Sequence, residues 1–535
     1  MGLNDVRDRL EVRLAEERAA LAAAGIEILS EHVAVGLTVW TCEMEHDLDP
    51  VEITISIGDG FPWLPPEISS PAPFLQRHQV PSRDGSFCLD RTDAPWWSPQ
   101  RTIVELLEHL QGLLDADTAG ASRVDEADMA EPASAYLSEP GFPVMLLPAT
   151  LLRATLGAEA GRLRLHHLSG RRDRWLVTAV TAKGVKLDVA TEARPSWIHL
   201  DKQSSVDVAW SDLGTVRDLN GIRRAERHLL AVASRQRVPR KRDRARQRWH
   251  AITYLEEGPT RNQTRRAWSF ARLDGVALQF ASTQALSMVE RSARRRGLVE
   301  LGDARVTIFG AGSVGSMVAM QLAQAGVRLM NLVDHDRYDV NNGVRHVLPA
   351  DYFGEKKASA TAAFINAHQP FCSAKAHEIL VGGVPGSVDA AADLIRESDL
   401  VVDSTGEVLV GRLLGDLSAQ VGVPILRCAL LEQGRYGYVF VRGPTTGDLD
   451  QFLDLPELPD RSEETSSNYT PYSCSHPAVS CAPFQPAELA IRAVRIAAGV
   501  LSTTPSQQFA HDWLIVRLDY SGDVQLGSLP REHDL

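Results

Sequence analysis

The pattern of hydrophobic and polar positions at the N-terminus predicts a small mixed α/β module. Apolar residues at helical spacing predict a helix over 4–24, and a strand-like run follows at 27–42. The run VEITISI at 51–57 alternates apolar and polar side chains, which is typical of a half-buried strand. Three prolines within 61–70 exclude a helix there.

A second helix is expected before the module ends near residue 120. Apolar residues line one face between 103 and 114, and Ser98 with Pro99 fits an N-cap followed by the first helical position. The stretch 115–141 is acidic and rich in small residues, which indicates a linker.

The rest of the chain divides into an unassigned middle and a recognisable third region. Residues 142–285 alternate short apolar runs with charge and contain no motif, and we interpret the basic run 235–248 as a solvated surface. From about 286 the pattern changes, and 305–336 reads as strand, glycine-rich turn, helix and strand, a βαβ unit.

Composition limits the classes of protein. The 535 residues are too many for one core, and 44% hydrophobic with 23% charged residues is typical of globular domains. A net charge of -13 argues against nucleic acid as a partner. No apolar run is long enough to span a membrane and the N-terminus does not resemble a signal peptide, so we expect a cytoplasmic protein.

Cysteine usage predicts free thiols and points to one of them. No CxxC pair is present, which argues against a structural zinc site. Cys88 lies in the polar turn DGSFCLDRTDAPWWSP, an unusual setting for a packing thiol. Cys42, Cys372 and Cys428 lie in apolar runs and are expected to pack in cores.

The glycine-rich turn predicts a nucleotide site. Gly310 and Gly312 permit a tight turn and close approach of a phosphate, and Gly315 permits close packing of helix on strand. Asp334, at the end of the next strand, suits a ribose hydroxyl. Because this loop pattern also serves nicotinamide enzymes, it does not by itself identify the reaction.

Positive residues after Asp334 favour chemistry on a phosphate. Asn342, Arg345 and Lys357 follow within 25 residues. Two cations there have no use in hydride transfer, whereas an attack on the α-phosphate of ATP needs them to balance the charge of the transition state. A nicotinamide oxidoreductase is therefore disfavoured.

Residues 305–358 resemble the adenylation domain of ubiquitin-activating enzymes and of the ThiF and MoeB proteins of cofactor synthesis. The resemblance implies ATP and Mg²⁺ as cofactors, and a homodimer. It also assigns nucleotide-binding roles, with Arg345 and Lys357 catalytic, to Gly310, Gly312, Gly315, Asp334, Asp336, Asn342, Arg345, Lys357 and Asp403. The family's D-x-T-D stretch reads DSTG at 403–406, so the second aspartate is missing and Asp403 is the expected metal ligand.

The first 120 residues resemble ubiquitin-conjugating enzymes. The shared features are FPWLPP at 61–66, a histidine ten residues before Cys88, the sequence CLD at 88–90, and WSP at 97–99 ahead of a helix. Cys88 then matches the catalytic cysteine. The family's HPN reads HQV at 78–80, so the asparagine that steadies the oxyanion is absent.

Both resemblances involve acyl transfer through sulfur. An activating domain of this kind carries its own cysteine before a late helix, and the segment 472–501 offers Cys474, which we prefer, and Cys481 as a rival. We therefore expect a multidomain α/β protein. It has a conjugating-like α+β domain (1–120), a linker region of unknown fold (121–285) and a Rossmann-like ThiF-type adenylation domain (286–535).

This order of domains resembles fusion proteins of the bacterial anti-phage operons called CBASS. The resemblance implies ATP-dependent activation of the flexible C-terminal tail of a cGAS-like nucleotidyltransferase and its conjugation to a target amine. Two alternatives stay open. The cargo could be a separate ubiquitin-like modifier, or the chain could activate a sulfur carrier with a non-catalytic N-terminal domain.

Overall fold

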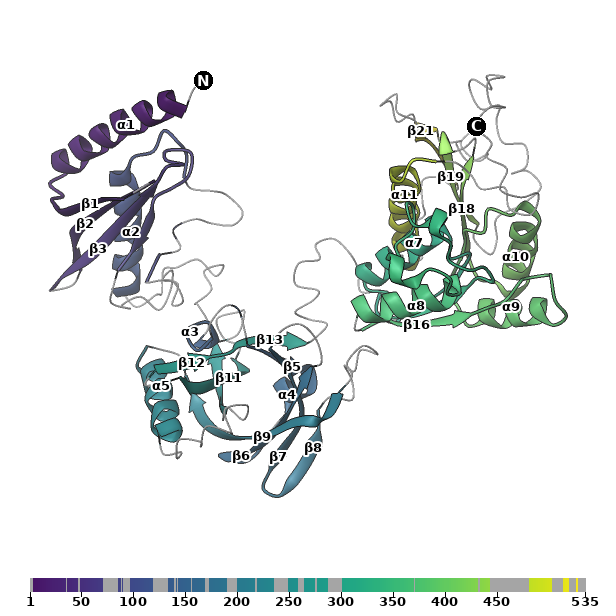
Figure 1. Ribbon diagram of the computed structural model, residues 1–535, viewed down its shortest axis with the longest axis horizontal. Coiled ribbons are helices and arrows are strands. Elements are labelled where there is room, and N and C mark those ends of the chain that lie inside the picture. The colour runs from purple at the N-terminus through teal and green to yellow at the C-terminus, as the bar shows by residue number, and fades with distance from the viewer. Residues whose placement is uncertain are drawn as a thin grey trace. The chain divides into compact units, whose positions relative to one another are not determined.

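A computed structural model shows the fold (Figure 1). It describes residues 3–118, 133–286, 301–442, 481–502, 513–518 and 526–527, apart from gaps at 35, 47–48, 71–84, 88, 90–96, 139–140, 142, 155, 169–172, 190–199, 217–218, 235–248, 258–263, 275–276, 370 and 432–433. Contacts divide the chain into two compact units, 1–192 with 199–287 and 193–198 with 288–535. The expected multidomain α/β class is confirmed. None of the described helices combines the length and apolar character needed to cross a bilayer.

The N-terminal module is a four-stranded antiparallel meander with two helices. Its elements are α1 (Leu3–Ala23), β1 (Ile28–Ala34), β2 (Leu37–His46), β3 (Asp49–Gly58), β4 (Glu67–Ser69) and α2 (Ile103–Thr118). Leucines of both helices share one core with Trp40 of β2 and the isoleucines of β3. The run expected as one strand at 27–42 is a hairpin, because Gly36 takes a φ of 75° and reverses the chain.

The start of α2 differs from the expected one. Thr102, not Ser98, caps the helix: its Oγ1 accepts a hydrogen bond from Glu105 N (3.2 Å), and Glu105 Oε2 accepts one from Thr102 N (2.7 Å). This reciprocal pair is a capping box. Glu17 of α1 also accepts a hydrogen bond from Ile103 N at 2.8 Å, so the first turn is satisfied from two sides.

The middle of the chain, for which the sequence predicted no fold, contains a nine-stranded sheet. Its strands are β5 (Val144–Pro148), β6 (Ala160–Leu168), β7 (Arg174–Ala182), β8 (Val185–Asp188), β9 (Leu200–Thr215), β10 (His250–Glu257), β11 (Thr264–Asp274), β12 (Ala277–Phe280) and β13 (Ser282–Leu286). The order is β12-β11-β10-β9-β6-β7-β5-β13, with β8 paired to β7. Because β12 and β13 lie at opposite ends of this order but are separated by only Ala281, the sheet curls back on itself (Figure 1).

Aromatic and aliphatic side chains fill the inside of this curled sheet. Trp210 and Trp268 pack edge to face with ring centroids 5.6 Å apart. The helices of this part are α3 (Ala133–Tyr136), α4 (Ala149–Arg153) and α5 (Leu219–Ser234).

The prediction of a linker over 115–141 is wrong at both ends of that range. At its start α2 continues to Thr118, and near its end Ala133 and Leu137 pack in a core with α5. Buried Glu256 of β10 accepts hydrogen bonds from Ser134 N (2.7 Å) and Ser134 Oγ (2.9 Å). The basic run 235–248 lies outside the described residues.

The C-terminal unit is a doubly wound sheet. Its strands are β14 (Arg305–Phe309), β15 (Leu329–Val333), β16 (Ser373–His377), β17 (Leu400–Asp403), β18 (Ile425–Leu431), β19 (Tyr436–Arg442), β20 (Trp513–Arg517) and β21 (Leu526–Gly527). The order is β16-β15-β14-β17-β18-β19-β20-β21, and the first five are parallel. The chain moves outward from β14 to β16 and then returns to place β17 on the other side of β14. Doubly wound sheets bind ligands at such a reversal of strand order, which here falls at the carboxyl ends of β14 and β17.

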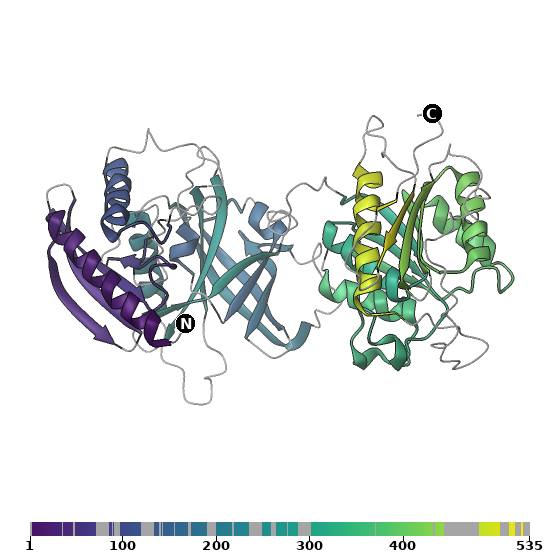
Figure 2. The same ribbon diagram turned by 90° about the horizontal axis from the view of Figure 1, so that it is seen from above.

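Helices cover both faces of this sheet. The shared core of one face includes α7 (Ser313–Ala325), α8 (Lys357–His368) and α11 (Phe484–Ser502), and α11, yellow in Figure 2, packs beside α7. The other face is covered by α9 (Ser387–Arg396) and α10 (Val408–Val421). Two short 3-10 helices, η2 (Val340–Asn342) and η3 (Ala350–Tyr352), lie between β15 and α8.

Candidate active site

The glycine loop lies where the sequence placed it, between β14 and α7. Gly310 has a φ of 89°, and a Cβ there would lie 2.8 Å from the backbone of Ser404. A Cβ on Gly315 would lie 1.9 Å from Gly310 O, whereas one on Gly312 would meet no atom within 4 Å. Gly310 and Gly315 are therefore required by packing, and Gly312 faces open space at the start of α7 with no side-chain cap.

Asp334 braces the glycine loop. Its Oδ2 accepts a hydrogen bond from Ala311 N (2.7 Å) and its Oδ1 accepts one from Asp336 N (2.8 Å). Only 8% of this residue is exposed. Each carboxylate oxygen can accept a further hydrogen bond, and the ribose contact stays a prediction.

Lys357 is held at the first position of α8. Its Nζ lies 3.0 Å from Asp336 Oδ2, and its backbone N donates to Asp336 O at 2.9 Å. Since only 13% of the lysine side chain is exposed, this pair is partly shielded from solvent. The structure thus brings Lys357, Asp336 and Asp334 into one hydrogen-bonded group beside the glycine loop.

Asn342 and Arg345 lie on the segment between β15 and α8. Asn342 Oδ1 accepts a hydrogen bond from Asp339 N (3.1 Å) in a capping box at η2, and Arg345 N donates to Asn342 O at 3.0 Å. Arg345 Nη1 lies 3.6 Å from Cys481 Sγ, just before α11. This contact brings a thiol next to one of the predicted catalytic cations.

Asp403 has a different environment from the one expected of a metal ligand. Its Oδ1 accepts hydrogen bonds from Thr405 N (3.0 Å) and Thr405 Oγ1 (2.7 Å), and its Oδ2 lies 3.0 Å from Arg427 Nε. Burial raises the pKa of Asp403, and the neighbouring Arg427 opposes that rise. Both oxygens of Asp403 thus face partners inside the protein, and its role as a metal ligand stays a prediction.

The other carboxylates around the loop also have partners within the protein. Donor atoms of Asp334, His335 and Asp336 lie within 4.8 Å of one another, but Asp334 is bonded to backbone N–H groups and Asp336 is paired with Lys357. Binding of Mg²⁺ at this site therefore stays a prediction.

Two residues of the site were missed from the sequence. Ser404 Oγ lies 2.8 Å from Gly310 O and 3.0 Å from Phe309 O, and its single proton is shared between these two acceptors, which ties the end of β17 to the glycine loop. His346 contacts the same loop from the other side, with Nε2 2.8 Å from Ala311 O. Both residues adjoin predicted ones, Asp403 and Arg345, and that adjacency was the only signal in the sequence.

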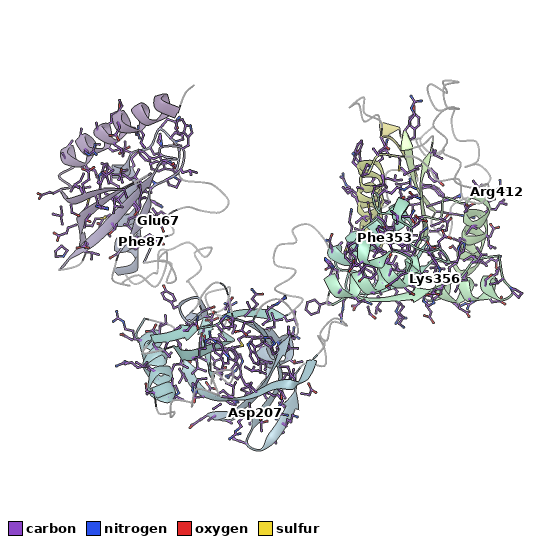
Figure 3. The ribbon with its side chains drawn as sticks, viewed as in Figure 1. Glu67, Phe87, Asp207, Phe353, Lys356 and Arg412 are labelled. Atoms are coloured by element: carbon purple, nitrogen blue, oxygen red, sulfur yellow. The ribbon has the colours of Figure 1, made fainter. Side chains whose placement is uncertain are left out.

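The predicted cysteines are described only in part. Cys88, Cys474 and the histidine at 78 lie outside the described residues. Phe87, labelled in Figure 3, is buried and its N donates to Ile68 O at 2.7 Å, and Trp97 Nε1 donates to Pro62 O at 2.8 Å. The described residues on either side of the Cys88 segment are thus anchored to β4 and to the proline-rich turn.

The packing role expected for three other cysteines is confirmed. Cys42 and Cys428 are fully buried, and Cys372 packs against the core of the C-terminal unit. Burial raises the pKa of the Cys42 thiol to about 11. Such a thiol stays protonated at neutral pH and is a poor nucleophile.

The fold and the glycine loop define a nucleotide-binding domain of the doubly wound class. Comparison with known families gives the class more narrowly: residues 286–501 match the model of the ThiF family. The C-terminal part of the chain is thus a ThiF domain, as the sequence predicted.

Curated relatives agree with this assignment. The chain is 29% identical over 215 residues to the uncharacterized protein y4qC of Sinorhizobium fredii, covering 37% of each chain. It is 28% identical over 146 residues to the ATP-dependent ubiquitin transferase-like protein Cap2 of Enterobacter hormaechei, covering 27% of this chain and 24% of Cap2. It is 33% identical over 166 residues to the probable adenylyltransferase/sulfurtransferase MoeZ of Mycobacterium tuberculosis, covering 30% of this chain and 41% of MoeZ.

These alignments span about a quarter to two fifths of the relatives' own length. The names of Cap2 and MoeZ indicate enzymes of the adenylating and ubiquitin-transferase-like type, which is the predicted type. Among solved structures, Escherichia coli MccB bound to AMPCPP and MccA matches with 15% identity and a TM-score of 0.32, covering 43% of this chain and 64% of MccB. So low a TM-score carries no conclusion about function.

Proposed function

We propose that the chain uses ATP to activate the C-terminal carboxylate of a partner protein and transfers it through cysteine thioesters to an amine. The carboxylate attacks the α-phosphate of ATP, and pyrophosphate leaves. A thiolate of the C-terminal unit attacks the acyl carbon, and AMP leaves. The Cys88 thiolate then takes the acyl group, and a target amine attacks it to form an amide and release the thiol.

The observation that carries this proposal is the position of Arg345. The next residue, His346, contacts the glycine loop at Ala311, and the side chain of Arg345 lies 3.6 Å from Cys481 Sγ. A cation at this place can balance charge on the phosphates, and a thiol beside it is near the point where an acyl-adenylate would form. Lys357, held by Asp336, supplies the second cation.

The receiving thiol of the C-terminal unit is Cys474 or Cys481. Cys474 has the sequence setting that we prefer, and the contact with Arg345 favours Cys481. The full chain with ATP and its partner should give a thioester visible on a non-reducing gel and lost with thiol reagent. Of Cys474→Ala and Cys481→Ala, the variant that abolishes this first thioester but not ATP–pyrophosphate exchange identifies the residue. If both variants form it normally, the relay is wrong.

For the partner, we propose a cGAS-like nucleotidyltransferase of an anti-phage operon, acting in the cytoplasm with a homodimeric activating unit. The order of the domains supports this choice, and the name of Cap2, an ATP-dependent ubiquitin transferase-like protein, supports the transfer chemistry. Co-expression with such a nucleotidyltransferase should yield conjugates that disappear when its last residues are deleted. Conjugation of a ubiquitin-like modifier instead would refute the partner but leave the chemistry intact.

A second function is favoured by the match to MoeZ, which is named an adenylyltransferase/sulfurtransferase. In that case the chain would adenylate a sulfur-carrier protein, and the N-terminal module would only bind. Mass spectrometry of the carrier would then detect a C-terminal thiocarboxylate, and Cys88→Ala would leave its yield unchanged.

A further inference from the structure

His346 makes two hydrogen bonds that fix its tautomer. Its Nε2 lies 2.8 Å from Ala311 O, and its Nδ1 lies 3.2 Å from Leu348 N. Because a carbonyl can only accept and a backbone N–H can only donate, Nε2 carries the proton and Nδ1 is the acceptor. Residue His346 is 9% exposed, and burial lowers its pKa to about 4. It is therefore a neutral bridge at physiological pH.

Aromatic packing holds the ring in this orientation. Tyr338 lies against His346 with ring centroids 4.9 Å apart, and its hydroxyl donates to Leu348 O at 2.6 Å. Phe353, labelled in Figure 3, stacks on Tyr338 with centroids 5.0 Å apart. Leu348 is thereby bonded at its N by the histidine and at its O by the tyrosine, so the segment after Arg345 is held at two points.

The bridge joins the two parts of the candidate nucleotide site. Ala311 is hydrogen-bonded through both backbone groups, since its O accepts a hydrogen bond from His346 Nε2 and its N donates one to Asp334 Oδ2. His346 is also the residue directly after Arg345. The hydrogen bond from His346 to Ala311 therefore connects the glycine loop to the position next to Arg345 in the chain.

We propose that His346 is a positioning residue that sets Arg345 relative to the phosphate-binding glycine loop. This inference rests on the proposed function, because it takes the loop and Arg345 to contact one triphosphate. A glutamine could keep both bonds, since its amide carries an N–H donor and a carbonyl acceptor. A leucine would remove both and leave two buried backbone groups without partners.

The test is a double-mutant cycle on the full chain, with ATP and MgCl₂ as the probe and calorimetry as the measurement. His346→Leu should weaken ATP binding about tenfold, and His346→Gln should stay within about threefold of wild type. In an Arg345→Ala background, His346→Leu should add less than about twofold, because the residue it positions is gone. Equal effects in both backgrounds, or no loss in His346→Leu, would overturn the proposal.

A second measurement does not depend on the leucine variant folding. The ¹⁵N-histidine spectrum of the wild-type chain should contain one Nε2–H tautomer that does not exchange, assigned by its disappearance in His346→Gln. A ring that averages between tautomers would contradict the bridge. Failure of the wild-type chain to bind ATP would refute the nucleotide site as well, whereas normal ATP binding with no coupling refutes only the role of His346.

Discussion

The nucleotide site and the described residues on either side of Cys88 are anchored by different combinations of contacts. Around the glycine loop, side chains from three separate segments are hydrogen-bonded to one turn. They are Asp334 after β15, Ser404 after β17 and His346 after η2. In the N-terminal module, Phe87 and Trp97 are buried in the core, and each also donates one hydrogen bond to a backbone carbonyl, of Ile68 and of Pro62. A small, highly charged ligand needs preorganised polar groups. A thiol that receives a protein chain needs only a stiff frame and access.

The largest effect should come from removing the thiol. Cys88→Ala should abolish conjugates while ATP–pyrophosphate exchange continues, because the proposed adenylation site belongs to the other unit. Cys372→Ala, which alters a half-buried packing thiol, is the matched control and should conjugate normally. Conjugates formed by Cys88→Ala would contradict the relay.

Two glycine substitutions should separate packing from ligand contact in the nucleotide site. Gly315→Ala forces a Cβ to 1.9 Å from Gly310 O, so it should destabilise the C-terminal unit by about 3 kcal/mol or more. Gly312→Ala meets no atom within 4 Å and should fold normally but weaken ATP binding. Thermal unfolding measures the loss of stability, and calorimetry measures the loss of ATP affinity. Equal losses of stability in the two variants would contradict the packing role that we assign to Gly315 but not to Gly312.

The pH dependence of stability should depend on His346. Burial, with a smaller effect of Lys357, lowers the pKa of His346 from 6.5 to about 4. Between pH 4 and pH 6.5 the unfolded chain therefore binds more protons than the folded chain. His346 does not reduce the free energy of unfolding above about pH 6.5, and it reduces that free energy increasingly as the pH falls toward 4. The shift corresponds to about 3 kcal/mol at most.

The measurement is unfolding of the C-terminal unit in urea at pH 7, 6 and 5. His346→Gln removes this proton linkage and should lose less stability than wild type over the same range. If the free energy of unfolding falls equally with pH in wild type and His346→Gln, another group controls the loss of stability in acid.

The smallest effect should appear in the N-terminal module. Trp97→Phe removes the hydrogen bond to Pro62 O but keeps an aromatic ring near Phe61. We expect a loss of about 1 kcal/mol, seen as faster hydrogen exchange in the core strands β2 and β3. Exchange in the C-terminal unit is the internal control and should not change.

Local patterns predicted some features well and missed others for identifiable reasons. The βαβ unit at 305–336 was found because its glycines, helix and strands are consecutive in the chain. The start of α2 was misplaced because Ser98 and Thr102 are both competent caps, and only the Glu105 partner and the Glu17 contact select Thr102. The central sheet was missed because its pairings, such as β6 with β9, join segments about forty residues apart.

The sequence by itself determined the glycine loop, the two cations after it and the cysteine in its proline- and tryptophan-rich setting. Each depends on residue types at short spacing, which backbone geometry and chemistry restrict locally. Only the tertiary structure decided that Asp403 pairs with Arg427, that Arg345 meets Cys481 and that His346 bridges to Ala311. Those contacts join positions 24 to 136 residues apart, and their partners are selected by strand order and burial, which no local pattern encodes.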